Sequence, residues 1–186
     1  IENLLAENKL DIAITMPPQH WPAGQFTVLF RDRLLLAIAP DYWYFRTNEV
    51  HVQNINKKFP QIHLRDMAQC GFILITNRRA LRDIEEEACT AAGFQPKVIL
   101  ETKSIESAHT MAVAGLGATF VPESFLRFSK IKKCLSYYLP DIPAPEIVLG
   151  VLQPQKQALP VSAKRFIEIL QEFFLKEMSS YDITAV

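Results

Sequence analysis

Neither sign of charge predominates in this sequence of 186 residues, because 20 lysines and arginines balance 20 aspartates and glutamates. Modules that bind nucleic acid usually have a clear basic excess, since contacts to phosphates dominate their affinity. The even balance argues against DNA binding by this segment alone. We therefore expect no DNA-binding residues within it.

Long apolar runs are also missing. No stretch approaches the roughly 18 apolar residues of a membrane-spanning helix, and the acidic residues 1–8 do not form a signal peptide. The sequence lacks an initiator methionine and opens inside an apparent helix, so we expect further residues upstream. With 49% hydrophobic and 22% charged residues, the composition is that of a globular domain. We expect a cytoplasmic protein without a membrane partner.

Cysteine and histidine are too few and too scattered for a disulfide framework or a metal centre. The three cysteines (Cys70, Cys89 and Cys134) form no C-x-x-C unit, which favours buried free thiols in a reducing compartment. The four histidines (His20, His51, His63 and His109) lack the spacing of metal ligands. We therefore expect no metal and no cofactor.

Motifs of known enzyme classes are absent as well. The sequence contains no G-x-S-x-G elbow and no phosphate-binding loop. Gly115-Leu116-Gly117 follows a predicted helix and precedes a predicted strand, the reverse of a dinucleotide-binding turn, and Phe120 occupies the third glycine position. Asp11, at a helix–strand junction, is interpreted as a residue that satisfies backbone donors. We expect no catalytic residues, and hence no enzyme.

What the sequence does contain is an alternation of strand-like and helix-like segments, which predicts an α/β fold. Residues 26–30 and 34–39 are predicted as two strands joined at Arg31-Asp32-Arg33, and residues 41–61 as a long loop with a partly buried aromatic cluster. The helix over 81–91 is expected to bury Leu81 and to expose its acidic residues, Glu85 among them, and to end at Gly93. Other predicted strands lie at residues 10–15, 72–75, 98–100, 118–121, 137–139 and 147–152, and other helices at residues 64–69, 123–128 and 161–178.

Two segments resemble a known family. Residues 4–14, which contain Leu10-Asp11-Ile12-Ala13-Ile14, are similar to a helix that leads into G-x-L-D-x-A-I, although Asn8-Lys9 replaces the glycine-containing turn. Residues 111–122 are similar to V-A-x-G-x-G-x-x-x-x-P. Both patterns are signatures of the effector-binding domain of LysR-type transcription regulators, and the resemblance covers nearly the whole chain. Residues 41–61 depart from it, because this stretch is longer than the family usually has.

The resemblance implies two Rossmann-like lobes of the periplasmic-binding-protein type 2 fold, joined by two crossover strands. It places residues 1–24 and 141–186 in one lobe and residues 25–140 in the other, with part of the first lobe expected upstream. It also implies an upstream winged helix-turn-helix that binds promoter DNA, and assembly into homodimers or tetramers.

In such a fold a ligand lies between the lobes, at strand ends and helix N-termini. Thr15 and Met16 end a strand there, although the Thr15 hydroxyl could instead bond its own backbone. Thr76, Asn77 and Arg82 lie at a strand-to-helix junction. An anionic ligand would relieve the crowding of arginines at that helix start, but Arg82 could equally pair with Glu85 or Glu86 one turn on.

Ser104 and Ile105 complete the set of candidate ligand-binding residues, since they open the next helix. Ser104 could bind the ligand or cap the helix, and the two roles are compatible. The sequence thus predicts a domain that senses a small anionic metabolite. A solute-binding protein of a transporter with the same fold remains an alternative, and an enzyme on this fold a weaker one.

Overall fold

The computed structural model describes residues 1–18, 24–54, 58–76, 79–128, 135–143, 146–154 and 158–179. The chain divides into two compact units: unit 1 contains Ile1–Arg31 and Val148–Val186, and unit 2 contains Asp32–Ile147. Within the described residues, no helix is both long enough and apolar enough to cross a lipid bilayer.

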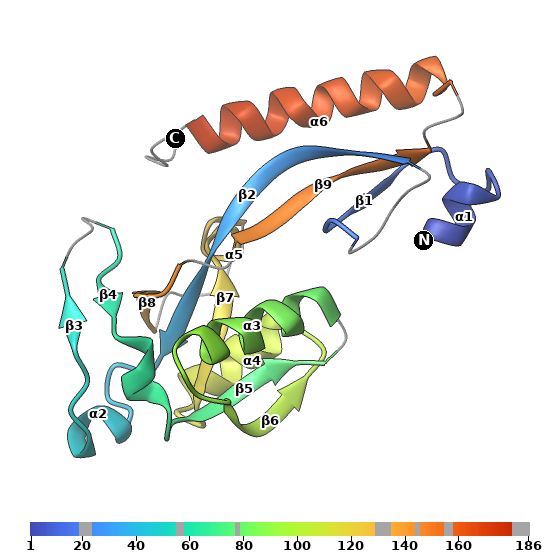
Figure 1. Cartoon of the computed structure of the whole chain (residues 1–186). Coiled ribbons are helices and arrows are strands. Elements are labelled where there is room, and N and C mark those ends of the chain that lie inside the picture. The colour runs from blue at the N-terminus through green and yellow to red at the C-terminus, as the bar shows by residue number, and fades with distance from the viewer. Residues whose placement is uncertain are drawn as a thin grey trace. The chain divides into compact units, whose positions relative to one another are not determined.

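Unit 2 is built on a mixed sheet whose strands follow the order β3-β4-β8-β2-β7-β5-β6 (Figure 1). Strands β5, β6 and β7 run parallel to one another, while β2 runs antiparallel to both β7 and β8. The strand bounds are β2 Gly24–Ile38, β3 Val52–Gln53, β4 Gln61–Ile62, β5 Gly71–Ile75, β6 Lys97–Thr102, β7 Ala118–Pro122 and β8 Ser136–Pro140.

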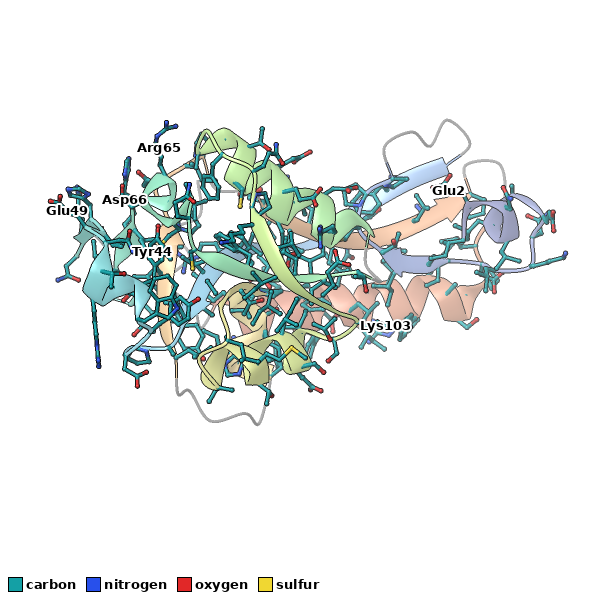
Figure 2. All side chains as sticks on the ribbon, turned by 90° about the horizontal axis from the view of Figure 1, so that it is seen from below. Glu2, Tyr44, Glu49, Arg65, Asp66 and Lys103 are labelled. Atoms are coloured by element: carbon teal, nitrogen blue, oxygen red, sulfur yellow. The ribbon has the colours of Figure 1, made fainter. Side chains whose placement is uncertain are left out.

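Helices α3 (Arg79–Ala91) and α4 (Ile105–Val113) both pack on β5, and they cover opposite faces of the parallel strands (Figure 2). A strand covered on both faces needs a continuous apolar sequence, and β5 has one, since Phe72 to Ile75 are all fully buried. In the described part of unit 2 the remaining helices are α2 Tyr44–Thr47, the 3₁₀ helix η1 Leu64–Met67, and α5 Glu123–Phe128. The predicted α/β class is confirmed.

Strand β2 corrects one prediction. Residues 26–30 and 34–39 are not two strands with a turn between them, because β2 continues from Gly24 to Ile38 through Arg31, Asp32 and Arg33. These charged residues are accommodated without a turn: Asp32 is 3% exposed and accepts hydrogen bonds from two backbone N–H groups, while Arg33 pairs with Glu123. Strand β2 therefore passes from unit 1 into unit 2, and β9 (Glu146–Pro154) passes back.

Unit 1 contains β1 (Ala13–Thr15), which pairs antiparallel with β9, and β9 in turn pairs with β2. Its helices are α1 (Glu2–Ala6) and α6 (Val161–Ser179). The rings of Phe30 on β2 and Phe174 on α6 stack with their centroids 4.6 Å apart, which fixes the long helix against the strand.

Residues 41–61 are more ordered than the predicted loop, since they contain α2, β3 and the first residue of β4. The predicted aromatic cluster is present: Tyr42 and Tyr44 are 5% and 3% exposed, and the Tyr44 hydroxyl donates a hydrogen bond to the carbonyl of Asp66 at 2.8 Å. Strand β4 pairs with β8, which lies more than 70 residues further along the chain. A pattern of local residues cannot reveal such a pairing.

Helix α3 confirms one expectation and contradicts another. Gly93 follows the helix with φ +84°, a conformation that glycine adopts without the steric cost of a side chain. Glu85, however, is fully buried, and its Oε2 accepts the N–H of Ile75 at 3.3 Å. The prediction that Glu85 lies on the exposed face is wrong, because the carboxyl group serves the last backbone donor of β5.

Candidate functional site

The candidate site lies in unit 2, where the parallel strands β5 and β6 end. Thr76 follows β5, and both its backbone N–H and its hydroxyl donate to the carbonyl of Thr102 at the end of β6, at 2.8 and 3.2 Å. These two bonds keep the ends of the two strands together. Ser104 comes two residues after Thr102, so the strand ends deliver the start of α4 to this edge.

Ser104 caps α4. Its backbone is extended, its Oγ accepts the N–H of Ser107 at 3.3 Å, and its carbonyl accepts the N–H of Ala108 at 3.0 Å. The N–H groups of Ile105 and Glu106 belong to the first turn of α4, where backbone N–H groups have no acceptor inside the helix. Together with the helix dipole they give this end a partial positive charge that attracts anions.

A pocket of about 530 Å³ opens at this capped end. We call it the Ser104 pocket, and its lining consists of Lys103, Ser104, Ile105, Glu106, Pro122, Ser124, Phe125 and Phe128. Lys103 is exposed where β6 ends (Figure 2), so its ammonium group can reach solvent and ligand alike. The pocket combines a cationic side chain and hydroxyl groups with two phenyl rings, which suits a ligand with both a charged and an apolar part.

Helix α5 supplies several lining residues of the pocket, and buried charged side chains hold its first turn in place. Asp32 accepts the N–H of Ser124 with both carboxylate oxygens, at 3.2 and 3.3 Å, and therefore caps α5. Burial raises the pKa of Asp32 above its ordinary value, although the hydrogen bonds from Ser124 and Arg33 oppose the rise. The carboxylate of Glu123, 4% exposed, pairs with Arg33 at 2.6 Å and with Lys58 at 2.6 Å. Glu123 thereby neutralises much of the local positive charge.

The structure distributes the predicted ligand-binding residues over several places. Ser104 and Ile105 line the Ser104 pocket, and Thr76 lies at the neighbouring strand end. Thr15 and Met16 belong to unit 1, at and just after the end of β1, and are half-buried. Asn77 lies outside the described residues.

Arg82 is already engaged by acidic side chains. Its Nε lies 2.6 Å from Glu86 one turn along α3, and its Nη1 lies 3.1 Å from Glu101 on β6. The pairing with Glu86 is one of the two alternatives that the sequence left open. The other acidic partner, Glu101, is remote in sequence and was not anticipated.

The other lining residues of the pocket were missed by the sequence reasoning. Lys103 directly precedes the predicted cap Ser104, and this adjacency in sequence is the signal that could have indicated it. Ser124, Phe125 and Phe128 lie on α5, and only the parallel placement of β7 beside β5 brings that helix to the same edge. The two described cysteines, Cys70 and Cys89, are free and buried as expected, and burial raises the pKa of each thiol to about 12.

Comparison with known proteins assigns the family. The sequence model of the LysR substrate binding domain matches residues 1–175, so the chain belongs to this family, which consists of effector-binding domains of transcription regulators and is not a family of enzymes. Among curated relatives, the transcriptional dual regulator GltC of Bacillus subtilis (strain 168) is 29% identical over 116 residues. That alignment covers 62% of this chain and 38% of GltC, so the matched part spans well under half of that regulator.

Solved structures confirm the fold. The effector-binding domain of BenM with its effector benzoate matches with a TM-score of 0.72 at 17% identity, over 99% of this chain and 78% of that one. The effector-binding domain of QuiR in complex with shikimate matches with a TM-score of 0.70 at 15% identity, over 94% of this chain and 76% of that one. The predicted periplasmic-binding-protein type 2 fold is therefore confirmed.

Proposed function

We propose that this chain is the sensory domain of a LysR-type transcription regulator and that it binds a small organic anion in the Ser104 pocket. The observation on which the proposal rests is the capped N-terminus of α4, which opens into a pocket of about 530 Å³ beside an exposed lysine. That volume lies within the range of small-molecule sites. In this proposal the ligand is bound and released unchanged.

The charges around the pocket favour an anion. The free N–H groups of the first turn of α4 and the ammonium group of Lys103 supply positive charge to the pocket. The charges of Arg33 and Lys58 are instead balanced by their ion pairs with Glu123. Glu106 is the acidic residue of the lining, and it is exposed to solvent, which weakens its repulsion of a bound anion. Arg82 is left out of the proposed site because its guanidinium group already forms ion pairs with two carboxylates, those of Glu86 and Glu101.

The phenyl rings of Phe125 and Phe128 favour a ligand with a ring or another compact hydrocarbon part. The effectors in the structures of BenM and QuiR, benzoate and shikimate, combine a ring with a carboxylate. We infer the same class of ligand here, a small cyclic carboxylate whose charged end meets α4. Thr15, Met16, Thr76 and Asn77 remain predicted ligand-binding residues.

The regulatory consequence follows from family membership. We infer that the whole protein is cytoplasmic, binds promoter DNA through another domain, and assembles as a homodimer or tetramer. A bound ligand can change DNA binding only if it has different affinities for two states of the protein. The ligand's preference for one state would then set the output of the promoter.

Calorimetric titration with cyclic carboxylates, and with the corresponding uncharged amides, tests the proposal. We expect one carboxylate per chain and at least tenfold weaker binding of the amide, since about 1.4 kcal/mol corresponds to a factor of ten. Asparagine and aspartate both cap helices well, so Ser104→Asn and Ser104→Asp should leave α4 capped. Ser104→Asp should bind the carboxylate at least tenfold more weakly than Ser104→Asn, because only aspartate adds a negative charge.

Two results of this titration would contradict the proposal. Equal affinities in Ser104→Asn and Ser104→Asp would place the carboxylate elsewhere on the protein. Equal affinities for carboxylates and amides would show that charge does not select the ligand.

A further inference from the structure

A second pocket in unit 2, of about 350 Å³, lies where the β3–β4 hairpin meets η1. Its lining consists of His51, Gln53, Gln61, His63, Asp66 and Asp141. His51 directly precedes β3, His63 lies between β4 and η1, and Asp66 belongs to η1. No part of the proposed effector site includes these residues. The pocket contains two of the four histidines of the chain.

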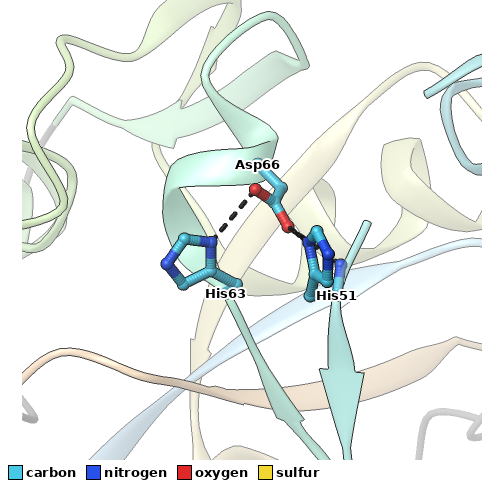
Figure 3. Close-up of side chains that lie close together, drawn as sticks. All are labelled: His51, His63 and Asp66. Atoms are coloured by element: carbon cyan, nitrogen blue, oxygen red, sulfur yellow. Dashed lines mark hydrogen bonds and ion pairs between the residues drawn. The ribbon is translucent and has the colours of Figure 1, made fainter. Parts of the chain in front are cut away.

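The two imidazole rings and one carboxylate converge there, as Figure 3 shows. The Nδ1 atom of His51 lies 2.8 Å from one oxygen of Asp66, and the Nδ1 atom of His63 lies 3.0 Å from the other. One metal-binding atom from each of these residues lies within 4.8 Å of the other two. In a tetrahedral site with bonds of about 2.0–2.1 Å, neighbouring ligand atoms are roughly 3.3 Å apart. Small side-chain rotations therefore suffice to surround one ion.

The backbone holds the three side chains in place. The N–H of His51 donates to the Asp66 carboxylate at 2.8 Å, and the N–H of His63 donates to the carbonyl of His51 at 2.9 Å. Asp141 accepts the N–H of Leu64 at 2.9 Å with its Oδ1 atom. Such fixed orientation reduces the entropy that ligand side chains lose when an ion binds.

The outer nitrogen of each ring faces a further carboxylate. His63 Nε2 lies 3.4 Å from Asp141 Oδ2, and His51 Nε2 lies 3.6 Å from Glu49 Oε1. Histidines that bind metal through one nitrogen usually donate the N–H of the other to a carboxylate or carbonyl, which orients the ring and raises its basicity. In this pocket the carboxylates of Asp141 and Glu49 lie near the two outer nitrogens at ion-pair distance, and Nδ1 of each ring is turned inward. The observation is independent of the convergence on Asp66.

We propose that His51, His63 and Asp66 bind one divalent transition-metal ion, with Zn²⁺ as the best match, and that Asp141 supports the site from behind His63. Imidazole suits zinc, nickel and copper, whereas magnesium and calcium prefer sites made only of oxygen atoms. The side chains of His51 and His63 are 62% and 47% exposed, so an ion can enter and water can complete its coordination. The ion would join the hairpin of residues 52–62 to η1 and stabilise unit 2.

Zinc binding by the chain, purified without a histidine tag, tests the proposal. In competition with a chromogenic chelator, we expect one Zn²⁺ per chain and at least a tenfold loss of affinity in His51→Gln and in His63→Gln. Asp141→Asn should lose about tenfold, the lower end of the effect of residues behind the ligands. Gln53→Ala, in the same pocket but without a metal-binding group, is the matched control and should stay within twofold.

Co²⁺ in place of Zn²⁺ identifies the ligands. A tetrahedral visible spectrum that disappears in His51→Gln supports the site. An intense thiolate-to-cobalt band would assign the ion to a cysteine and overturn the proposal. Wild-type affinity in both histidine variants, or no zinc bound by the wild-type chain, would overturn it too, and the three residues would then form only a hydrogen-bonded clamp.

Discussion

Glu85 lies on α3 with its side chain fully buried, and replacing it with glutamine has an effect on stability that depends on pH. Its Oε2 accepts the N–H of Ile75, and its Oε1 is buried without a hydrogen-bond partner. Burial disfavours the ionised carboxylate and raises the pKa of Glu85 to about 8, against an ordinary value of 4.5. Glutamine resembles the protonated acid in shape and can still accept the bond from Ile75.

The magnitude follows from linkage between protonation and folding. Between the two pKa values the folded state keeps the proton of Glu85 and the unfolded state has lost it, so stability falls by about 1.4 kcal/mol for each unit of pH. The Gln variant has no such proton. The stability of Glu85→Gln relative to the wild type should therefore rise by roughly 2 to 3 kcal/mol from about pH 5.5 to about pH 7.5.

Urea denaturation of both proteins at several pH values measures this difference, and contributions from other titrating groups cancel in it. Glu87→Gln, an exposed position on the same helix, makes the identical chemical change and is the matched control. Parallel pH profiles for the wild type and Glu85→Gln would refute the reasoning.

Two further stability predictions can be checked in the same assay. Gly93 and Gly115 both have positive φ, but an added Cβ at Gly93 would collide with the Arg65 guanidinium while the space at Gly115 is open. Gly115→Ala and Gly93→Ala should each cost about 1 kcal/mol from the backbone alone, because the exposed Arg65 side chain can move away from the added Cβ, and an unchanged midpoint in either variant would contradict this reasoning. Glu123→Ala removes the partner of Arg33 and Lys58 at a buried position and should cost about 1–3 kcal/mol, whereas an unchanged midpoint would show that the ion pairs contribute nothing.

The sequence predicted the parts of the fold that depend on local patterns. The apolar run Phe72–Ile75 was correctly predicted as a strand, and the Ser104 cap and Gly93 mark helix ends in the ordinary way. Strand β2 was divided wrongly because Arg31-Asp32-Arg33 interrupts its apolar pattern. The partners that accommodate those charges, Ser124 and Glu123, are about 90 residues away in sequence.

The sites show the same limit. Ser104 was predicted because a cap is a local signal, while Phe125 and Phe128 reach the pocket only through the order of the strands. The histidine cluster was missed because His51 and Asp66 are 15 residues apart and meet through the β3–β4 hairpin. The spacing of His63 and Asp66, three residues across the start of a short helix, was the one local sign of it.

Backbone amide shifts, followed by NMR while a cyclic carboxylate is titrated into the labelled chain, test most directly where the ligand binds. The first turn of α4 should respond most strongly, with saturating shifts at Ile105, Glu106 and Ser107 and a weaker response at Lys103. The matching amide should leave these signals in place. Saturating shifts confined to residues outside the Ser104 pocket, or none at all with any carboxylate tested, would contradict the assignment of this pocket as the effector site.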